Sequence, residues 1–569
     1  MVGLSHITKL KEYILTEQVS EKLTSELLKN TERQDNFTVF LSVCNKKERA
    51  RVFHGSGKTL LIAWTNAEKW LKEYQKKQIA KKKPLIGTWV KVDVVTDYET
   101  ILTEDLRNEI DKSLPYFFRK GIAFNNNFTT AYLENEVNCN KMLNYAKDKK
   151  PFNMKRINYY RNIYYNQPDL KEVPKQITLF TTTGFFCDED MNIIELCLEG
   201  LEYGRRKIDI LDKPLAEKLI NNASEYLFNM IKLDGSYIYG IFPIYHNVYE
   251  GYNILRHTGS IWALINYYRI TKNEALLPKL HSAMNYLLET HVERNNNTAW
   301  VVERKSDEIK IGGNGLAVIM LTEYMDVLKT DKYTSIVKVL ANGILELQDK
   351  ETGVYWHVLN YPDHTRKDEF RTIYYDGEAT FALARAYTYT KEKRYLDGAT
   401  LAVENFIKKD YTQYRDHWVA YSVNEVIKYI PEVRYFEFAM QNVENNTKRI
   451  LNQPRATPTN LELLMAAWLT YKQYKESNLK IEYIDNFDIP GFAETIYKRA
   501  VHGLNSFCFP EFAMYFQNPN EVIDSFIIRD DSFRIRIDDI QHFIGGYYIY
   551  TIFFDDLCPY IVKRLIKEI

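Results

Sequence analysis

The sequence predicts two domains: an α+β domain over residues 1–205 and an all-α domain of about six helical hairpins over residues 206–569. Up to about residue 200, strand-like and helix-like patterns of apolar residues alternate, whereas the remainder repeats helical patterns in pairs. The length of 569 residues also exceeds what one hydrophobic core normally holds. Both observations favour two separately organised parts.

Strand patterns occur throughout the amino-terminal part. Residues 37–44 and 48–54 predict a pair of strands, and 88–97 alternates apolar and polar side chains, as a half-buried strand does. The other elements expected here are strands over 121–134 and 176–188 and helices over 58–79, 103–119 and 138–148. This mixture predicts an α+β domain.

Residues 55–59, Gly-Ser-Gly-Lys-Thr, resemble a nucleotide-triphosphate-binding loop. That loop requires a first glycine at position 52, where this chain has Val52. The remaining Gly-Ser-Gly is too short for its backbone N–H groups to surround a phosphate. We therefore interpret Gly55–Gly57 as a turn between strand and helix, with Thr59 as the helix cap, and keep an ATP-dependent enzyme as a lower alternative.

Helical segments follow from about residue 213. The first helix of a pair is amphipathic, as in 214–232 and 275–292, which suits a helix with one face in water. The second is rich in small and apolar residues, over 259–270, 314–328, 377–389, 417–430, 460–474 and 542–554. Such helices are covered on all sides, so the pattern predicts a ring of inner helices inside a ring of outer helices. An open superhelical array is the alternative.

Two stretches, LRHTGSIWALINYYRITKN (255–273) and YYDGEATFALARAYTYTKEKRY (374–395), end alike in tyrosine, threonine and a charged turn. Together with the helix pairs, they resemble the (α/α)6 toroid of glycoside hydrolases, polysaccharide lyases and N-acylglucosamine 2-epimerases. The resemblance covers roughly 213–569. It implies that this part is an all-α (α/α)6 toroid, which follows the α+β N-terminal domain that the strand patterns predict. It also implies a carbohydrate-active enzyme whose active site lies at the mouth of the ring.

The starts of the predicted inner helices are rich in polar side chains. Capping explains some of them, because Asp, Asn and Thr are preferred at helix starts, but Arg and His are not capping residues. The candidate catalytic residues are Asp376, Glu378, Asp416, His417, Asp538, His257 and His542. The candidate substrate-binding residues are Arg256, Tyr252, Asn253, Tyr374, Tyr375, Arg536, Asn314 and Trp356.

Two mechanisms suit this set. In the first, a protonated carboxyl donates to a glycosidic oxygen while a second carboxylate acts as base or nucleophile. In the second, histidine or tyrosine removes a proton next to a carbonyl group, and arginine holds an anionic group through paired hydrogen bonds. The resemblance to sugar epimerases implies inner-helix histidines for this role. The choice between the two stays open at this point.

The composition excludes several other classes. The 75 basic and 75 acidic residues balance, which argues against nucleic acid as the main partner. The six cysteines form no C-x-x-C pair, so neither a disulfide framework nor a zinc site is expected. No stretch of about 18 apolar residues and no signal-peptide core occurs. We predict a soluble cytoplasmic enzyme that acts on a carbohydrate or glycan without metal or cofactor; a non-catalytic binding or assembly module is the alternative.

Overall fold

The computed structural model describes residues 4–28, 36–82 and 87–568, which form two compact units. Unit 1 comprises Met1–Asp209, Ile241–Asn247 and Asn505–Ile535. Unit 2 comprises Ile210–Gly240, Val248–Leu504 and Arg536–Ile569. Whereas the sequence suggested one continuous second domain from residue 206, two segments of that region make their contacts within unit 1. No helix in the described residues is long and apolar enough to cross a membrane.

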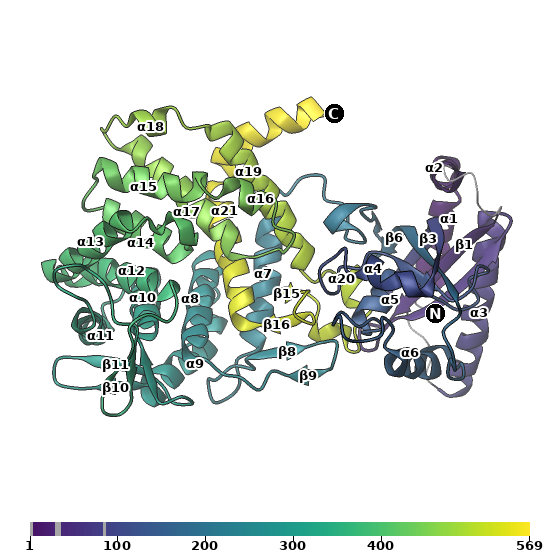
Figure 1. The fold of residues 1–569 in the computed structure, drawn as a ribbon, viewed down its shortest axis with the longest axis horizontal. Helices are drawn as coiled ribbons and strands as arrows, with labels where there is room; N and C mark the ends of the chain where they lie inside the picture. The colour runs from purple at the N-terminus through teal and green to yellow at the C-terminus, as the bar shows by residue number, and fades with distance from the viewer. Residues whose placement is uncertain (1–3, 29–35, 83–86, 569) are drawn as a thin grey trace. The chain divides into compact units, whose positions relative to one another are not determined.

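Unit 1 is built on an antiparallel sheet with the strand order β2-β1-β3-β6-β4-β5, in which β7 also pairs with β6 (Figure 1). The strands of this sheet are β1 Phe37–Cys44, β2 Arg51–Gly57, β3 Trp89–Leu102, β4 Gly121–Ala123, β5 Ala131–Tyr132, β6 Gln176–Cys187 and β7 Ile193–Glu195. Unit 1 also contains β15 Ile527–Ile528, which belongs to a different sheet. The helices are α1 Leu4–Ile14, α2 Glu17–Leu28, α3 Leu60–Ala80, α4 Leu106–Ile110, α5 Glu134–Cys139, α6 Met154–Tyr160 and α20 Pro510–Ala513. Apolar residues of α1, α2 and α3 form one core with β1 and β3.

Four expected elements of unit 1 are corrected. The helix expected over 103–119 is only a 3-10 turn and α4, which ends at Ile110; Pro115 lacks an N–H and excludes a regular helix through to residue 119. The helix expected over 138–148 is not formed, because α5 ends at Cys139 and Lys141 has a left-handed φ of 55°. The strand expected over 121–134 is the short hairpin β4–β5. β3 is buried from Trp89 to Val95, not half-buried, because Lys91 and Asp93 neutralise each other at 3.1 Å inside the unit.

The Gly-Ser-Gly stretch belongs to a strand and is not the expected turn. β2 stays paired with β1 until Gly57 lies opposite Phe37. A side chain on Gly55 would lie 2.4 Å from the backbone N of Ala67 in α3, so glycine lets the helix pack directly on the strand. Thr59 caps α3 as predicted, accepting a hydrogen bond from the Ile62 N–H at 3.2 Å. No phosphate-binding loop is formed at this position.

Unit 2 is mainly helical. Among the described residues, α8, α10, α12, α14, α17 and α21 each contact the next helix in this order, and α21 contacts α8, which closes the cycle. For most neighbouring pairs in the cycle, one further helix packs against both members. These helices are α11 on α10 and α12, α13 on α12 and α14, α15 on α14 and α17, α19 on α17 and α21, and α7 on α21 and α8. α9 packs on α8. Figure 1 shows both sets in the part of the chain coloured from teal through green to yellow.

The segments expected to form the inner and outer helices are helical in the structure. The helices that form the cycle are α8 Ile254–Thr271, α10 Ile311–Leu328, α12 Tyr374–Thr390, α14 His417–Ile427, α17 Thr459–Glu476 and α21 Ile537–Glu568. The remaining helices are α7 Lys213–Asn229, α9 Leu277–Thr290, α11 Thr334–Glu346, α13 Lys393–Lys408, α15 Val433–Glu444, α16 Thr447–Leu451, α18 Glu482–Asp485 and α19 Ile489–Gly503.

Short strands interrupt this region, which the sequence predicted to be helical throughout. They occur in the loops between helices, where segments of two to five residues are too short for their alternation to stand out. A sheet in the order β10-β11-β12-β13-β14 is formed by β10 Val292–Arg294, β11 Ala299–Glu303, β12 Glu308–Lys310, β13 Val358–Asn360 and β14 Arg366–Asp368. The other short strands are β8 Gly240–Phe242, β9 Asn247–Val248 and β16 Arg534–Arg536.

Candidate active site

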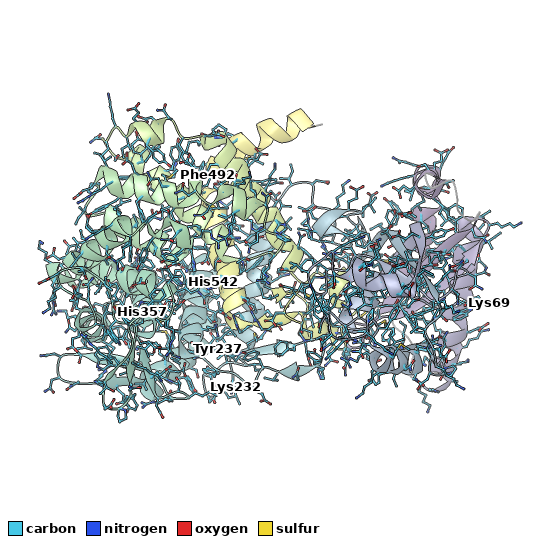
Figure 2. All side chains as sticks on the ribbon, in the orientation of Figure 1. Lys69, Lys232, Tyr237, His357, Phe492 and His542 are labelled. Atoms are coloured by element: carbon cyan, nitrogen blue, oxygen red, sulfur yellow. The ribbon has the colours of Figure 1, made fainter. Side chains whose placement is uncertain are left out.

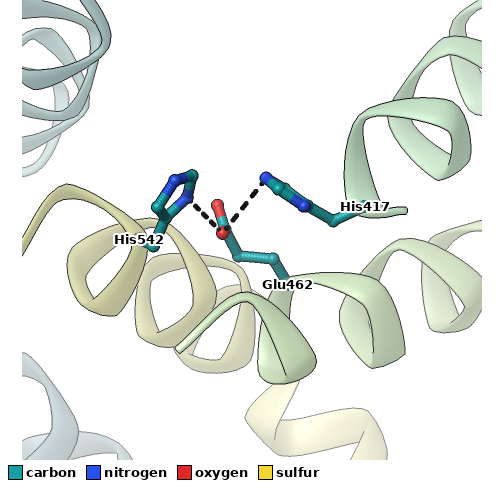
Figure 3. A group of neighbouring side chains, drawn as sticks. All are labelled: His417, Glu462 and His542. Carbon is teal, nitrogen blue, oxygen red and sulfur yellow. Dashed lines mark hydrogen bonds and ion pairs between the residues drawn. The ribbon is translucent and has the colours of Figure 1, made fainter. Parts of the chain in front are cut away.

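His417, Glu462 and His542 meet inside unit 2 (Figure 3; His542 is also labelled in Figure 2). His542 Nδ1 lies 2.7 Å from Glu462 Oε2, and His417 Nε2 lies 3.7 Å from the same oxygen. The imidazole centroids of the two histidines are 4.9 Å apart, with their planes nearly perpendicular at 89°. Two of the predicted catalytic residues are therefore neighbours, joined by a carboxylate that the prediction did not include.

Three consecutive helices of the cycle supply these side chains. His417 is the first residue of α14, and Glu462 and His542 lie in the early turns of α17 and α21. Gly545 of α21 faces the carboxylate, and a Cβ there would lie 2.6 Å from Glu462 Oε1. Tyr421 OH also donates to Glu462 at 3.2 Å. The small residue thus admits the carboxylate, while the histidine and tyrosine hold it in place.

The two histidines have opposite pKa shifts. Burial lowers the pKa of His417 well below its usual range, and the charge of His542 adds to this effect. Burial also opposes the charge of His542, but the ion pair with Glu462 and the nearby Asp538 and Asp539 outweigh it and raise its pKa. At neutral pH, His417 is therefore neutral and His542 is the more readily protonated of the two.

Predicted acids of α12 and α14 lie buried nearby. Burial, with the backbone N–H of Trp418 opposing it, raises the pKa of Asp416 to about 8. Burial and the charge of Asp416 raise the pKa of Glu378 well above its usual range. Asp376 lies 3.4 Å from His357 Nε2. Asp416 and Glu378 can therefore retain protons at neutral pH. Each of the three acids keeps one buried oxygen without a hydrogen-bond partner among the described residues.

Asp538 is an ion-pair partner at the start of α21. It lies 2.8 Å from Arg256 Nε and accepts from Arg536 Nη2 at 2.8 Å. Burial alone would raise its pKa, but these two guanidinium groups lower it. Asp538 is thus ionised and neutralises two of the predicted substrate-binding arginines.

The predicted tyrosines of α12 differ in exposure. The ring of Tyr374 is 46% exposed and its centroid lies 6.1 Å from that of His417. Tyr375 is buried, and its ring centroid lies 5.4 Å from that of His357. Tyr374 is therefore the tyrosine that combines exposure with closeness to the histidine pair.

Other predicted residues serve local structure. His257 is fully buried, bonded through Nδ1 to Tyr252 OH at 2.8 Å and through Nε2 to the Ala283 carbonyl at 3.0 Å, and burial lowers its pKa to about 3. Asn253 caps α8 by accepting from the backbone N–H of Leu255. The structure places none of these three side chains in contact with the histidine pair.

Asn314 and Trp356 also make structural contacts. The buried Asn314 amide accepts from the Val301 N–H at 2.8 Å and donates to the carbonyls of Ala299 and Leu340. The indole N–H of Trp356 donates to the Val358 carbonyl at 3.0 Å. Their hydrogen-bonding groups hold neighbouring loops and strands in place.

The sequence prediction missed Glu462 and His357. Glu462 lies within the pattern of a buried helix, where attention fell on Asn460 at the helix start. The signal available was an ionisable residue in a helix otherwise apolar on every side, since an unpaired carboxylate is rarely buried. His357 precedes β13 in a loop and carried no comparable signal.

His417, Glu462 and His542 are also the residues that could hold a metal ion. One ligand atom from each lies within 4.8 Å of the other two. Two imidazoles and a carboxylate are a donor set that zinc and other transition metals accept. In this structure, however, a hydrogen bond joins two of the three donors, so we treat the group as an acid–base cluster.

No family model and no curated protein matches this sequence. Among solved structures, a D-mannose isomerase is 14% identical with a TM-score of 0.47, over 59% of this chain and 97% of that one. Cellobiose 2-epimerase from Bacillus thermoamylovorans is 14% identical with a TM-score of 0.41, over 50% and 86%. A GH76 α-mannanase from Bacteroides thetaiotaomicron is 9% identical with a TM-score of 0.41, over 60% and 97%. The expected resemblance to carbohydrate-active enzymes thus recurs among solved structures, at values too low to transfer catalytic residues.

Proposed function

We propose that unit 2 is an (α/α)6 toroid and that the protein is a carbohydrate-active enzyme. The closed cycle of helix contacts, with a second layer of helices outside it, supports the toroid. The gathering of His417, Glu462 and His542 near the starts of three consecutive inner helices supports an active site at that end of the ring. A non-catalytic platform would have no use for two histidines held close together in different protonation states.

Within this class, the geometry best supports proton transfer on a reducing sugar, as in aldose–ketose isomerisation or 2-epimerisation. One observation carries this proposal: two neighbouring imidazoles with opposite pKa shifts lie beside one carboxylate. A general base must be neutral and a general acid protonated at the working pH, and the pair supplies both.

The reaction then proceeds as follows on the open-chain sugar. Neutral His417 removes the proton from C2, next to the C1 carbonyl, while protonated His542 donates a proton to the carbonyl oxygen. The C2–H electron pair forms the C1–C2 double bond of an enediol. Return of a proton to C1, with loss of one from the C2 hydroxyl, gives the ketose. Return of a proton to the opposite face of C2, with loss of one from the C1 hydroxyl, gives the epimer. Glu462, 3.7 Å from His417 Nε2, stabilises the charge that His417 gains.

Glycoside hydrolysis is the second candidate, favoured by a separate observation. Glu378 and Asp416 both have raised pKa values and a free buried oxygen, as the general acid of a glycosidase requires. Asp538, which is ionised, would be the base. The Asp538 carboxylate already pairs with two arginines, so hydrolysis is less well supported than proton transfer by the histidine pair.

Hydrogen exchange distinguishes these candidates. D-mannose, D-glucose and cellobiose are incubated with the protein in D2O, and deuterium at C2 is followed by NMR. We expect exchange with at least one sugar, and a loss of roughly 10²–10⁴-fold in His417→Asn and His542→Asn, the usual contribution of general acid–base catalysis. His364→Asn, which removes an exposed imidazole of the same unit, should leave exchange unchanged. Release of new reducing ends without exchange would instead favour hydrolysis through Glu378 and Asp416.

A further inference from the structure

Most of the arginines around the candidate site already pair with a carboxylate. Arg256 and Arg536 share Asp538, each at 2.8 Å. Arg371 forms two bonds of 3.0 Å with the two oxygens of Glu308. A guanidinium that already holds a carboxylate offers little to a charged substrate.

Arg415 lacks such a partner. It lies two residues before His417, and no carboxylate of the described residues pairs with it. Its side chain is half-buried, and its Nε is fully buried without an acceptor among the described residues. Its backbone has a φ of 55°, the left-handed region that a residue with a side chain seldom adopts. Residues held in this conformation are concentrated at ligand-binding and active sites.

A second unpaired arginine lies close to the first. The charge of Arg449 lies within electrostatic range of the Arg415 guanidinium. Arg449, on the short helix α16, is exposed and has no acidic partner in the part of the chain that the structure describes. Two like charges without a counter-ion repel each other, and an anion that binds near both removes this repulsion.

Tyr374 connects this arginine pair to the histidines. Its half-exposed ring lies 6.1 Å from the His417 ring, and the charges of Asp416 and Arg415 lie within electrostatic range of it. Exposed tyrosine rings pack well against the apolar faces of sugars, because they are flat, rigid and amphipathic. A sugar next to Tyr374 would therefore have His417 on one side and Arg415 nearby.

We propose that the substrate carries an oxyanionic group, either carboxylate or phosphate, which Arg415 binds through its guanidinium with Arg449 adding charge. This inference rests on the proposed function, because it places the sugar ring at His417. It assigns the site to uronic acids or sugar phosphates in preference to neutral sugars. Planar guanidinium groups suit both oxyanions, since they donate two parallel hydrogen bonds.

Binding tests the proposal independently of turnover. Affinities for D-glucose, D-glucuronate and D-glucose 6-phosphate are measured by calorimetry with the wild-type protein at low and at physiological salt. We expect at least one charged sugar to bind roughly tenfold or more tightly than glucose, the effect of charge-assisted hydrogen bonds. Glucuronate and glucose 6-phosphate as separate arms distinguish a carboxylate site from a phosphate site. Equal affinity for all three sugars would overturn the proposal.

Variants assign the preference to the residue. Arg415→Gln should abolish the preference for the charged sugar, and Arg415→Lys, which keeps the charge but not the paired donors, should reduce it. Lys448→Gln is the matched control, because it removes one exposed positive charge next to Arg449. A preference that survives in Arg415→Gln, or is lost equally in Lys448→Gln, would refute the assignment. Exchange at C2 without any preference would uphold the proposed function while refuting this inference.

Discussion

At the residue scale, Glu462 determines how the two histidines differ. Its carboxylate bonds to His542 at 2.7 Å but lies 3.7 Å from His417, beyond hydrogen-bond distance. An opposite charge stabilises the imidazolium, so the nearer histidine gains a proton while the buried, more distant one stays neutral. One carboxylate can therefore make an acid and a base from two identical side chains.

Replacing Glu462 by glutamine should shift the pH profile of the enzyme. Without the carboxylate, only Asp538 and Asp539 oppose the effect of burial, so the pKa of His542 falls and His542 loses its proton at a lower pH. The alkaline limb of kcat/KM for C2 exchange should move down by about 1–3 pH units, the usual effect of a close opposite charge. A histidine whose pKa is higher in the folded than in the unfolded protein stabilises the folded state at pH values below the unfolded pKa. This stabilisation is lost as the pH rises through the folded pKa. Glu462→Gln should therefore also lose this pH-dependent part of the free energy of unfolding.

Tyr421→Phe provides the control for this shift. It removes the 3.2 Å hydrogen bond to Glu462 but keeps the carboxylate, so the alkaline limb should stay within a few tenths of a pH unit of its original position. An unchanged profile in Glu462→Gln would mean that His542 is not the group whose protonation limits the reaction.

At the scale of secondary-structure elements, the prediction succeeded where long periodic patterns exist. The inner helices were predicted because apolar residues cover all their faces, and Thr59 was predicted as a cap from its place before α3. The prediction failed for short elements, such as β10–β14, whose length gives no usable period. It also failed for Glu462, whose partners His417 and His542 lie on other helices, 45 residues or more away in sequence. A sequence pattern within one helix gives no sign of such partners.

The β2–α3 contact shows what the Gly-Ser-Gly stretch does. Gly55 lies under α3, where an added Cβ would be 2.4 Å from the Ala67 N and 2.7 Å from the Ala63 O. Backbone atoms of a helix cannot move aside singly, so the helix as a whole would have to shift. Small-to-large changes of this kind typically cost about 1–3 kcal/mol.

Gly55→Ala should therefore destabilise unit 1 by about 1–3 kcal/mol, measured by urea denaturation. Hydrogen exchange of β2 and α3 amides should accelerate in the same variant. Lys58→Ala changes an exposed side chain of the same stretch and should alter neither stability nor exchange. Saturable ATP binding that Lys58→Ala abolishes would contradict our interpretation and restore a nucleotide site.

At the scale of the whole molecule, unit 1 is assembled from distant parts of the chain. Arg529 bonds to Glu134 at 2.5 Å, with both side chains 5% exposed, and Arg206 pairs with the fully buried Glu511 at 2.7 Å. Tyr515 OH and Ser42 Oγ lie 2.8 Å apart in the interior. The segment 505–535 therefore supplies buried charges and hydrogen bonds that residues 1–209 lack by themselves. Sequence patterns could not reveal this, because they report neighbours along the chain and not in space.

A fragment of residues 1–209 should consequently fail to fold. Removing one partner of a buried ion pair typically costs about 3–5 kcal/mol. This fragment loses Glu511, the partner of Arg206, and Arg529, one of the two arginine partners of Glu134. Since small domains are stable by only about 5–15 kcal/mol, the two losses are enough to unfold it. We expect no cooperative urea transition in tryptophan fluorescence for 1–209, and recovery of a transition when 505–535 is joined to it through a flexible glycine-serine linker. The same joined fragment with Arg529→Met and Glu511→Gln should lose most of the recovered stability. A cooperative transition in 1–209 alone would contradict this prediction. It would show that the amino-terminal residues form a self-sufficient domain, as the sequence pattern suggested.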